Sequence, residues 1–153
     1  MRFVLACLAV MGVALWTEAT AAGEADPLKP YQWHRRLLVV FAPSETEPRL
    51  VGQRDDMRRH AAGYLDRDLT VFFVVGEGPV QAFPVQPVDF DERALRARFD
   101  VAPEAFRIFL LGKDGGVKVS SGEVVGACRL FGIIDGMPMR RDEMKTRGGA
   151  VQC

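Results

Sequence analysis

Short apolar runs alternate with amphipathic segments along most of this chain. Two runs, residues 36–41 and 69–75, are almost wholly apolar, which is typical of strands in a sheet covered on both faces. Between them, residues 48–65 place apolar side chains near helical spacing, with charged residues in the intervening positions. The pattern therefore predicts two parallel strands joined by a crossover helix.

The second half of the chain predicts a shorter helix, a hairpin and two closing helices. Asp89 and Glu92 stand in capping-box register before a helix that runs to Phe99, and an Asp-Gly pair at residues 114–115 favours a hairpin turn. The remaining elements are expected as strands at residues 106–111 and 117–120 and helices at residues 124–135 and 138–145. This order predicts an α/β, thioredoxin-like three-layer sandwich with a mixed central sheet flanked by helices.

The N-terminus has the pattern of a secretory signal. Arg2 precedes an unbroken apolar run at residues 3–16, and the small residues 19–21 fit a cleavage site between Ala21 and Ala22. The run is shorter than the roughly 18 to 20 apolar residues that span a bilayer. We therefore expect a cleaved signal peptide of bacterial type and a periplasmic or secreted protein.

The remaining sequence suits one small domain. We expect a signal peptide at residues 1–21, a single domain at residues 22–147 with its core at about 30–146, and a C-terminal tail at residues 148–153. Lys and Arg number 20, and Asp and Glu also number 20, so the formal net charge is zero. Such a balance supplies no field that collects phosphate backbones. We predict no nucleic-acid partner and no stable membrane insertion after signal cleavage.

The residues around the lead-in to the first strand are polar, with aromatic side chains among them. Residues 22–33 contain Tyr31 and Trp33 between prolines and charged residues. We interpret this segment as an extended lead-in that is held by aromatic packing.

Three segments resemble the domain of unknown function 4174 family, of the P-DUDES type. They are residues 36–41, residues 110–118 and, most specifically, residues 134–144, which read IDGMPMRRDEM. The resemblance covers about residues 30–146. It implies a thioredoxin-like fold, and it implies no particular reaction.

The reactive site of a thioredoxin is missing from this sequence. A thioredoxin places CxxC between its first central strand and the next helix, where the helix N-terminus stabilises the thiolate; here residues 45–48 read Glu-Thr-Glu-Pro. The proline expected just before the strand that faces this motif is also missing, since Ala105 precedes Phe106 and the nearest proline is Pro103. We interpret the domain as a redox-inactive, non-enzymatic binding or interaction module without a cofactor, for an unknown protein or small-molecule partner.

Two segments are candidates for a binding surface. The first is the loop that replaces the redox motif, because loops on a rigid scaffold often carry function; the second is a basic stretch near the C-terminus. Acidic residues at a helix start and a solvated basic helix face explain the same residues without a ligand. The predicted surface residues are Ser44, Glu45, Thr46, Glu47, Arg140 and Arg141.

Two cysteines follow the predicted signal peptide, and three interpretations of them are open. Cys128 lies in an apolar helical stretch, where a thiol behaves as a small buried hydrophobe. It also has a possible disulfide partner in Cys153, since an exported protein meets an oxidising compartment. The third interpretation is a noncanonical thiol-disulfide or peroxiredoxin-like pair.

The sequence contains no standard metal motif. His34 and His60 lie in neither an HExxH nor a CxxC setting, so we predict no metal site. A weaker alternative is Cu(I) binding by the thioethers of Met137 and Met139, because soft ligands favour this ion. Packing of these side chains around a proline-started helix explains them without a metal.

Overall fold

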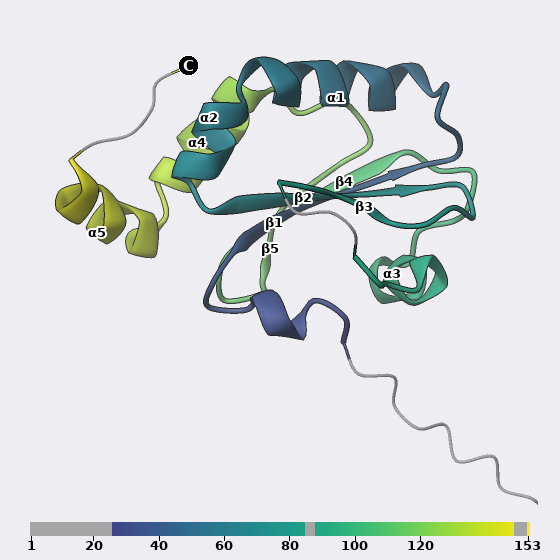
Figure 1. Cartoon of the computed structure of the whole chain (residues 1–153), viewed down its shortest axis with the longest axis horizontal. Helices are drawn as coiled ribbons and strands as arrows, with labels where there is room; N and C mark the ends of the chain where they lie inside the picture. Colours follow the sequence, from purple (N-terminus) through teal and green to yellow (C-terminus); the bar gives the residue numbers. More distant parts are fainter. Residues whose placement is uncertain (1–25, 85–87, 149–152) are drawn as a thin grey trace, which may run out of the picture.

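A five-stranded mixed sheet forms the centre of the molecule (Figure 1). The structure is a computed structural model that describes residues 26–84, 88–148 and 153. The strands are β1 (Arg36–Ala42), β2 (Leu69–Val75), β3 (Gln81–Phe83), β4 (Arg107–Leu111) and β5 (Val117–Ser121). Their order in the sheet is β3-β2-β1-β4-β5.

Strand direction follows from the connections. β1 pairs in parallel with β2 through a helical crossover, whereas β4 lies antiparallel to β1 and forms the predicted hairpin with β5. The short strand β3 pairs antiparallel with β2 at the sheet edge. Both β1 and β2 are buried along their whole length, as their continuous apolar runs predict.

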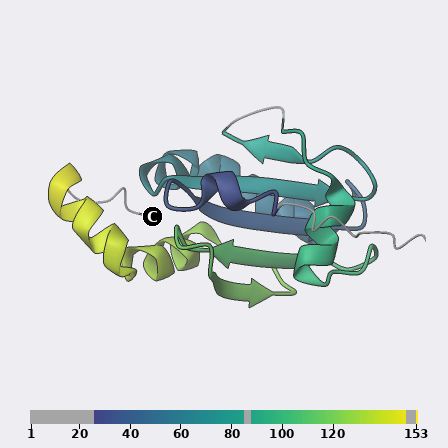
Figure 2. The same cartoon turned by 90° about the horizontal axis from the view of Figure 1, so that it is seen from below.

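Helices cover both faces of the sheet (Figure 2). They are the 3-10 turn η1 (Lys29–Tyr31) and the α-helices α1 (Pro48–Arg59), α2 (Ala61–Asp66), α3 (Glu92–Phe99), α4 (Ala127–Asp135) and α5 (Pro138–Arg147). One core cluster joins one face of the sheet to α1, α2 and α4, and the other joins the opposite face to α3 and the segment around η1. The predicted thioredoxin-like three-layer sandwich is thereby confirmed.

Three local predictions differ from the structure. The helix expected at residues 48–65 breaks at His60, whose backbone leaves the helical region (φ −115°, ψ 19°). The strand β3 was not predicted, because residues 79–88 have no clear period. Helix α3 is capped by Asp91, which accepts from the backbone N–H of Arg93, rather than by Asp89.

The lead-in to β1 is a 3-10 turn rather than an extended segment. The ring of Tyr31 packs edge to face against Phe72, with 5.2 Å between the centroids, and against Phe90 at 6.0 Å. Trp33 is 60% exposed, so the predicted aromatic packing holds for Tyr31 and is wrong for Trp33.

The predicted signal peptide lies outside the described residues and stays a prediction. Within the part of the chain that the structure describes, no helix is long and apolar enough to cross a membrane.

Candidate functional site

Three fully buried arginines lie at the end of the sheet where β1 and β2 begin. Arg36 is the first residue of β1, Arg67 follows α2 and Arg140 belongs to α5; their exposed fractions are 1%, 1% and 0%. A buried guanidinium is tolerated only with close acceptors around it. We call these residues and their carboxylate partners, Asp66, Asp135 and Glu143, the arginine cluster.

Each arginine of the cluster has a carboxylate within ion-pair distance. Arg36 donates from Nη1 and Nη2 to the two oxygens of Glu143, at 3.1 Å each. Arg67 donates to Asp135 from Nε at 3.0 Å and from Nη2 at 2.6 Å. Both are the forked geometry that favours Arg over Lys.

Arg140 ties α5 to the rest of the cluster. Its Nε donates to Asp135 at 3.1 Å, its Nη1 donates to the carbonyl of Asp66 at 2.8 Å, and its Nη2 contacts the Asp66 carboxylate. The proposed surface patch of Arg140 and Arg141 is therefore wrong for Arg140, which is buried, whereas Arg141 is exposed. Ion pairing inside the fold, which the sequence pattern does not show, explains the difference.

Lys113 also stabilises the ionised carboxylates beside the arginine cluster. Lys113 Nζ lies 2.9 Å from Asp68 and 2.8 Å from Glu143. Burial alone raises the pKa of Glu143, but hydrogen bonds from Arg36 and Lys113 outweigh it and hold that pKa below its usual range. Burial also raises the pKa of Asp68, but hydrogen bonds from Lys113 and Arg147 outweigh this effect, and the pKa of Asp68 is lowered as well.

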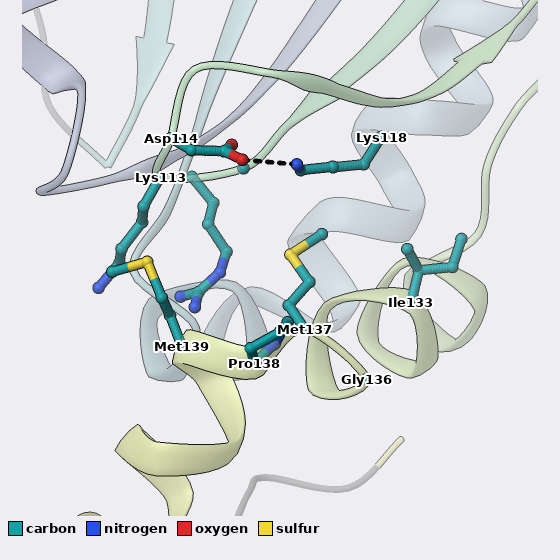
Figure 3. Close-up of a pocket in the computed structure, with 10 residues that line it drawn as sticks. Lys113, Asp114, Lys118, Ile133, Gly136, Met137, Pro138 and Met139 are labelled. Atoms are coloured by element: carbon teal, nitrogen blue, oxygen red, sulfur yellow. Dashed lines mark hydrogen bonds and ion pairs between the residues drawn. The ribbon is translucent and has the colours of Figure 1, made fainter.

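A cavity of about 420 Å³ opens beside the cluster, between the β4–β5 turn and the junction of α4 with α5. We call it the hairpin pocket. Figure 3 shows Met137 and Met139 pointing from the helix junction toward the hairpin residues Lys113 and Asp114. The pocket is lined by Arg36, Gly112, Lys113, Asp114, Lys118, Ile133, Gly136, Met137, Pro138 and Met139.

The hairpin pocket combines apolar walls with cationic side chains. Ile133, Met137, Pro138 and Met139 supply the apolar side, and the pocket volume lies within the about 300 to 1,000 Å³ of small-molecule sites. Arg36, Lys113 and Lys118 supply the cationic groups of the lining. Since hydrogen bonds from charged donors are stronger than those from neutral ones, the pocket suits a ligand that brings an acceptor.

The loop that replaces the redox motif stands where the sequence predicted it, directly before α1. Glu47 caps this helix by accepting from the backbone N–H of Arg49, and Arg49 Nε donates to it at 2.7 Å. Glu45 is exposed, pairs with Arg54 and accepts from Gln81 at 3.1 Å. Hydrogen bonds and charge from these cations lower the pKa of both glutamates, which disfavours them as proton donors near neutral pH.

The other members of the predicted loop surface are exposed. Ser44 and Thr46 share a hydrogen bond of 3.1 Å between their hydroxyl oxygens. The loop is therefore a capped, mutually bonded turn, separate from the hairpin pocket, which is formed by other elements. The recorded cis peptide bond, Phe83–Pro84, follows β3 and does not stand before β4, where redox enzymes of this fold use proline.

The two cysteines are joined. Cys128, in the first turn of α4, and Cys153 form a disulfide with 5.4 Å between their Cα atoms. The interpretation of Cys128 as a buried hydrophobe is wrong, because the helix turns its buried face, Ala127 with Leu130 and Phe131, to the core and leaves Cys128 exposed. Helical spacing in a short apolar stretch does not by itself fix which residue faces outward.

Met137 and Met139 come from the same turn and have different environments. Met137 is the N-cap residue of α5 and packs against the core, whereas Met139 is exposed. Their contribution to the pocket wall accounts for both thioethers, which fit irregular apolar surfaces. Copper binding by this pair stays a hypothesis.

Sequence reasoning missed the arginine cluster and the pocket. One signal was present, because Arg36 is a charged residue that opens an otherwise apolar strand. Its partner Glu143 lies 107 residues away, and no local pattern connects the two.

Comparison with known proteins gives a family and distant relatives. Coiled-coil domain-containing protein 80 of Danio rerio, for example, is 29% identical over 133 residues, which cover 76% of this chain and 15% of that protein. The chain thus spans a small part of this relative's length. No solved structure matches the chain.

The family match includes the candidate site. Residues 27–143 match the domain of unknown function DUF4174, a range that contains all residues lining the hairpin pocket and leaves Cys153 outside. The match extends over most of the chain, and the chain belongs to the DUF4174 family.

Proposed function

We propose that this domain is exported and acts as a binding module whose ligand occupies the hairpin pocket. The observation that carries the proposal is a cavity of about 420 Å³ that combines apolar walls with the cationic lining residues Arg36, Lys113 and Lys118. Cationic donors in an apolar cavity favour a ligand oxygen that accepts a hydrogen bond.

The chemistry of the walls narrows the ligand to a small, largely apolar molecule with one anionic group. The thioether and proline side of the pocket favours an apolar body. On the hairpin side, the pair of Lys118 and Asp114 spans 2.7 Å, with side chains 34% and 45% exposed. Such an exposed pair contributes little stability, so Lys118 can turn from Asp114 to an entering anion at small cost.

Titration of the isotope-labelled domain with 1-anilinonaphthalene-8-sulfonate, an apolar anion, tests the proposal by NMR. We expect saturable shifts at residues 112–118 and 133–139, and weaker binding of the neutral analogue N-phenyl-1-naphthylamine, which lacks the sulfonate. Met139→Ser should weaken binding, whereas Val51→Ser should not, because Val51 is an equally exposed apolar residue on α1 outside the pocket. Shifts spread over the surface, or equal effects of the two substitutions, would contradict the proposal.

Export is supported by the N-terminal sequence pattern and by the disulfide, since such bonds persist in oxidising compartments. Expression of the full sequence in a bacterial host, followed by mass measurement of the periplasmic protein, tests this part. A chain that begins near Ala22 supports export, and an uncleaved chain in the cytoplasm contradicts it.

A second candidate function is thiol-disulfide exchange by Cys128 and Cys153. The observation in its favour is an exposed disulfide with one sulfur in the first turn of α4, a position that stabilises a thiolate. This function predicts catalytic reduction of a disulfide substrate that is lost in Cys128→Ser. Turnover no faster than that of the variant would exclude it.

A further inference from the structure

A histidine lies beside the Cys128–Cys153 disulfide, so this corner of the molecule holds three side chains of metal-ligating type. His60 stands at the break between α1 and α2, and a ring nitrogen of His60 and the sulfurs of Cys128 and Cys153 all lie within 4.8 Å of one another. Both cysteines are exposed and His60 is half-buried. This corner shares no residue with the hairpin-pocket lining.

A hydrogen bond at one ring nitrogen of His60 leaves the other nitrogen free to ligate. His60 Nδ1 lies 2.8 Å from the backbone carbonyl of Asp56. A carbonyl oxygen only accepts, so Nδ1 carries the proton and the lone pair of the neutral ring is on Nε2. The Asp56 carboxylate, 3.4 Å from the same nitrogen, is itself held by the backbone N–H of Ala127 at 2.6 Å. Metal-bound histidines are commonly fixed in this way through their other nitrogen.

The sulfurs differ from ligands only in their oxidation state. In the disulfide neither sulfur is a thiolate, and it is the thiolate that binds metal. Cys128 is the second residue of α4, after the N-cap Gly126 and Ala127, where the helix dipole favours the thiolate once the bond is opened. Tetrahedral zinc sites hold two thiolates and one imidazole with bonds of about 2.0 to 2.3 Å, which places the ligand atoms about 3.5 to 3.8 Å apart. In the oxidised protein the histidine nitrogen and the sulfurs already lie within 4.8 Å of one another, so separation of the two sulfurs and an approach of the histidine by about 1 Å would meet this requirement.

We propose that reduction of the Cys128–Cys153 disulfide converts this corner, with His60, into a binding site for Zn²⁺. A dithiol reductant supplies two electrons and two protons: the bond between the two sulfurs breaks, two thiols form, and the reductant closes its own disulfide. Binding of Zn²⁺ then displaces one proton from each thiol, so that two thiolates and His60 Nε2 hold the ion. Water takes the fourth position, as in sites with three protein ligands. Exchange with a disulfide oxidant re-forms the bond between the two sulfurs, reduces that oxidant by two electrons to two thiols and releases the ion, so the site is under redox control.

The test compares oxidised and reduced protein, using the full mature chain with its cysteines intact. Zn²⁺ is titrated against a chromophoric chelator before and after reduction by a phosphine, and Co²⁺ replaces Zn²⁺ as a spectroscopic probe. We expect one Zn²⁺ per reduced chain, no stoichiometric binding by the oxidised chain, and a thiolate-to-Co²⁺ charge-transfer band in the reduced protein only.

Variants at the two histidines separate the site from general thiol binding. His60→Gln keeps both cysteines and should weaken Zn²⁺ binding by more than the about 10 to 100-fold that loss of a group hydrogen-bonded to a ligand costs. His34→Gln changes the other histidine, which is exposed near η1, and should bind as the parent does. Circular dichroism of the reduced chain checks that it stays folded. Equal binding by the oxidised and reduced chains, equal affinities of the two variants, or a Co²⁺ spectrum without a thiolate band would overturn the proposal.

Discussion

Arg140 and Arg141 are adjacent in sequence and provide a matched pair for testing the arginine cluster. Arg140→Met removes the donors that reach Asp135 and Asp66 and keeps a side chain of similar length. Breaking a buried ion pair from one side costs about 3 to 5 kcal/mol. We expect a loss at the lower end of this range, because the side chains of Asp66 and Asp135 are 19% and 25% exposed and Arg67 remains beside them, at 2.6 Å from Asp135 and 3.6 Å from Asp66.

Urea unfolding followed by far-ultraviolet circular dichroism measures the effect. With a slope of about 2 kcal/mol per molar urea for a domain of this size, a loss of about 3 kcal/mol lowers the midpoint by about 1.5 M. Arg141→Met should stay within about 0.5 kcal/mol of the parent, as exposed substitutions do. A double-mutant cycle of Arg140→Met with Asp66→Asn should show coupling of about 0.5 to 3 kcal/mol. Equal midpoints for the two methionine variants would refute the assignment of Arg140 to a stabilising buried network.

Three further predictions concern stability at low pH, the packing at Gly63 and the disulfide. First, folding lowers the pKa values of Glu143 and Asp68. The stability that these carboxylates contribute is therefore complete above their unfolded pKa values of about 4 and is lost as pH falls through their folded pKa values. The urea midpoint should drop below pH 4, and this drop should be less steep in Glu143→Gln than in the exposed control Asp142→Asn. Second, a Cβ on Gly63 would overlap the ring of Phe131, so Gly63→Ala should lose about 1 to 3 kcal/mol of stability. Gly132→Ala, at an exposed position of α4 where an added Cβ has no neighbouring atom within 4 Å, should gain up to about 1 kcal/mol; the melting temperatures of the two variants test this difference. Third, the disulfide joins residues that are 25 positions apart, so its removal in Cys128→Ser should lower the stability by about 3.5 kcal/mol on the chain-entropy estimate. A melting temperature of the parent protein that does not change on adding reductant would contradict this.

Local pattern was sufficient for the order and type of most elements. Continuous apolar runs predicted β1 and β2 because a strand covered on both faces has no polar side, and the Asp-Gly turn predicted the hairpin of β4 and β5. The predicted ends of the helices were less accurate than their order and type. The apolar spacing of residues 48–65 continues through the break at His60, and the cap at Asp91 lies only two residues from the predicted one.

The sites required more than local pattern. Clustered positive charge identified the basic stretch near the C-terminus, yet this pattern treats Arg140 and Arg141 alike. Only the fold brings Asp66 and Asp135, from two other helices, around one of them. The disulfide was an open alternative for the same reason, since a separation of 25 residues does not fix whether two Cα atoms meet within bonding range.

The sequence by itself determined a thioredoxin-like domain whose redox motif is replaced, because strands, helices and the absent CxxC are recorded in consecutive residues. Only the tertiary structure decided that Arg36 meets Glu143 beside a methionine-lined pocket, and that His60 lies next to two cysteines. Burial and ion pairing depend on which distant segments share a neighbourhood. That information arises when the sheet and its helices pack, since hydrophobic burial sets their arrangement and the polar groups must then find partners within it.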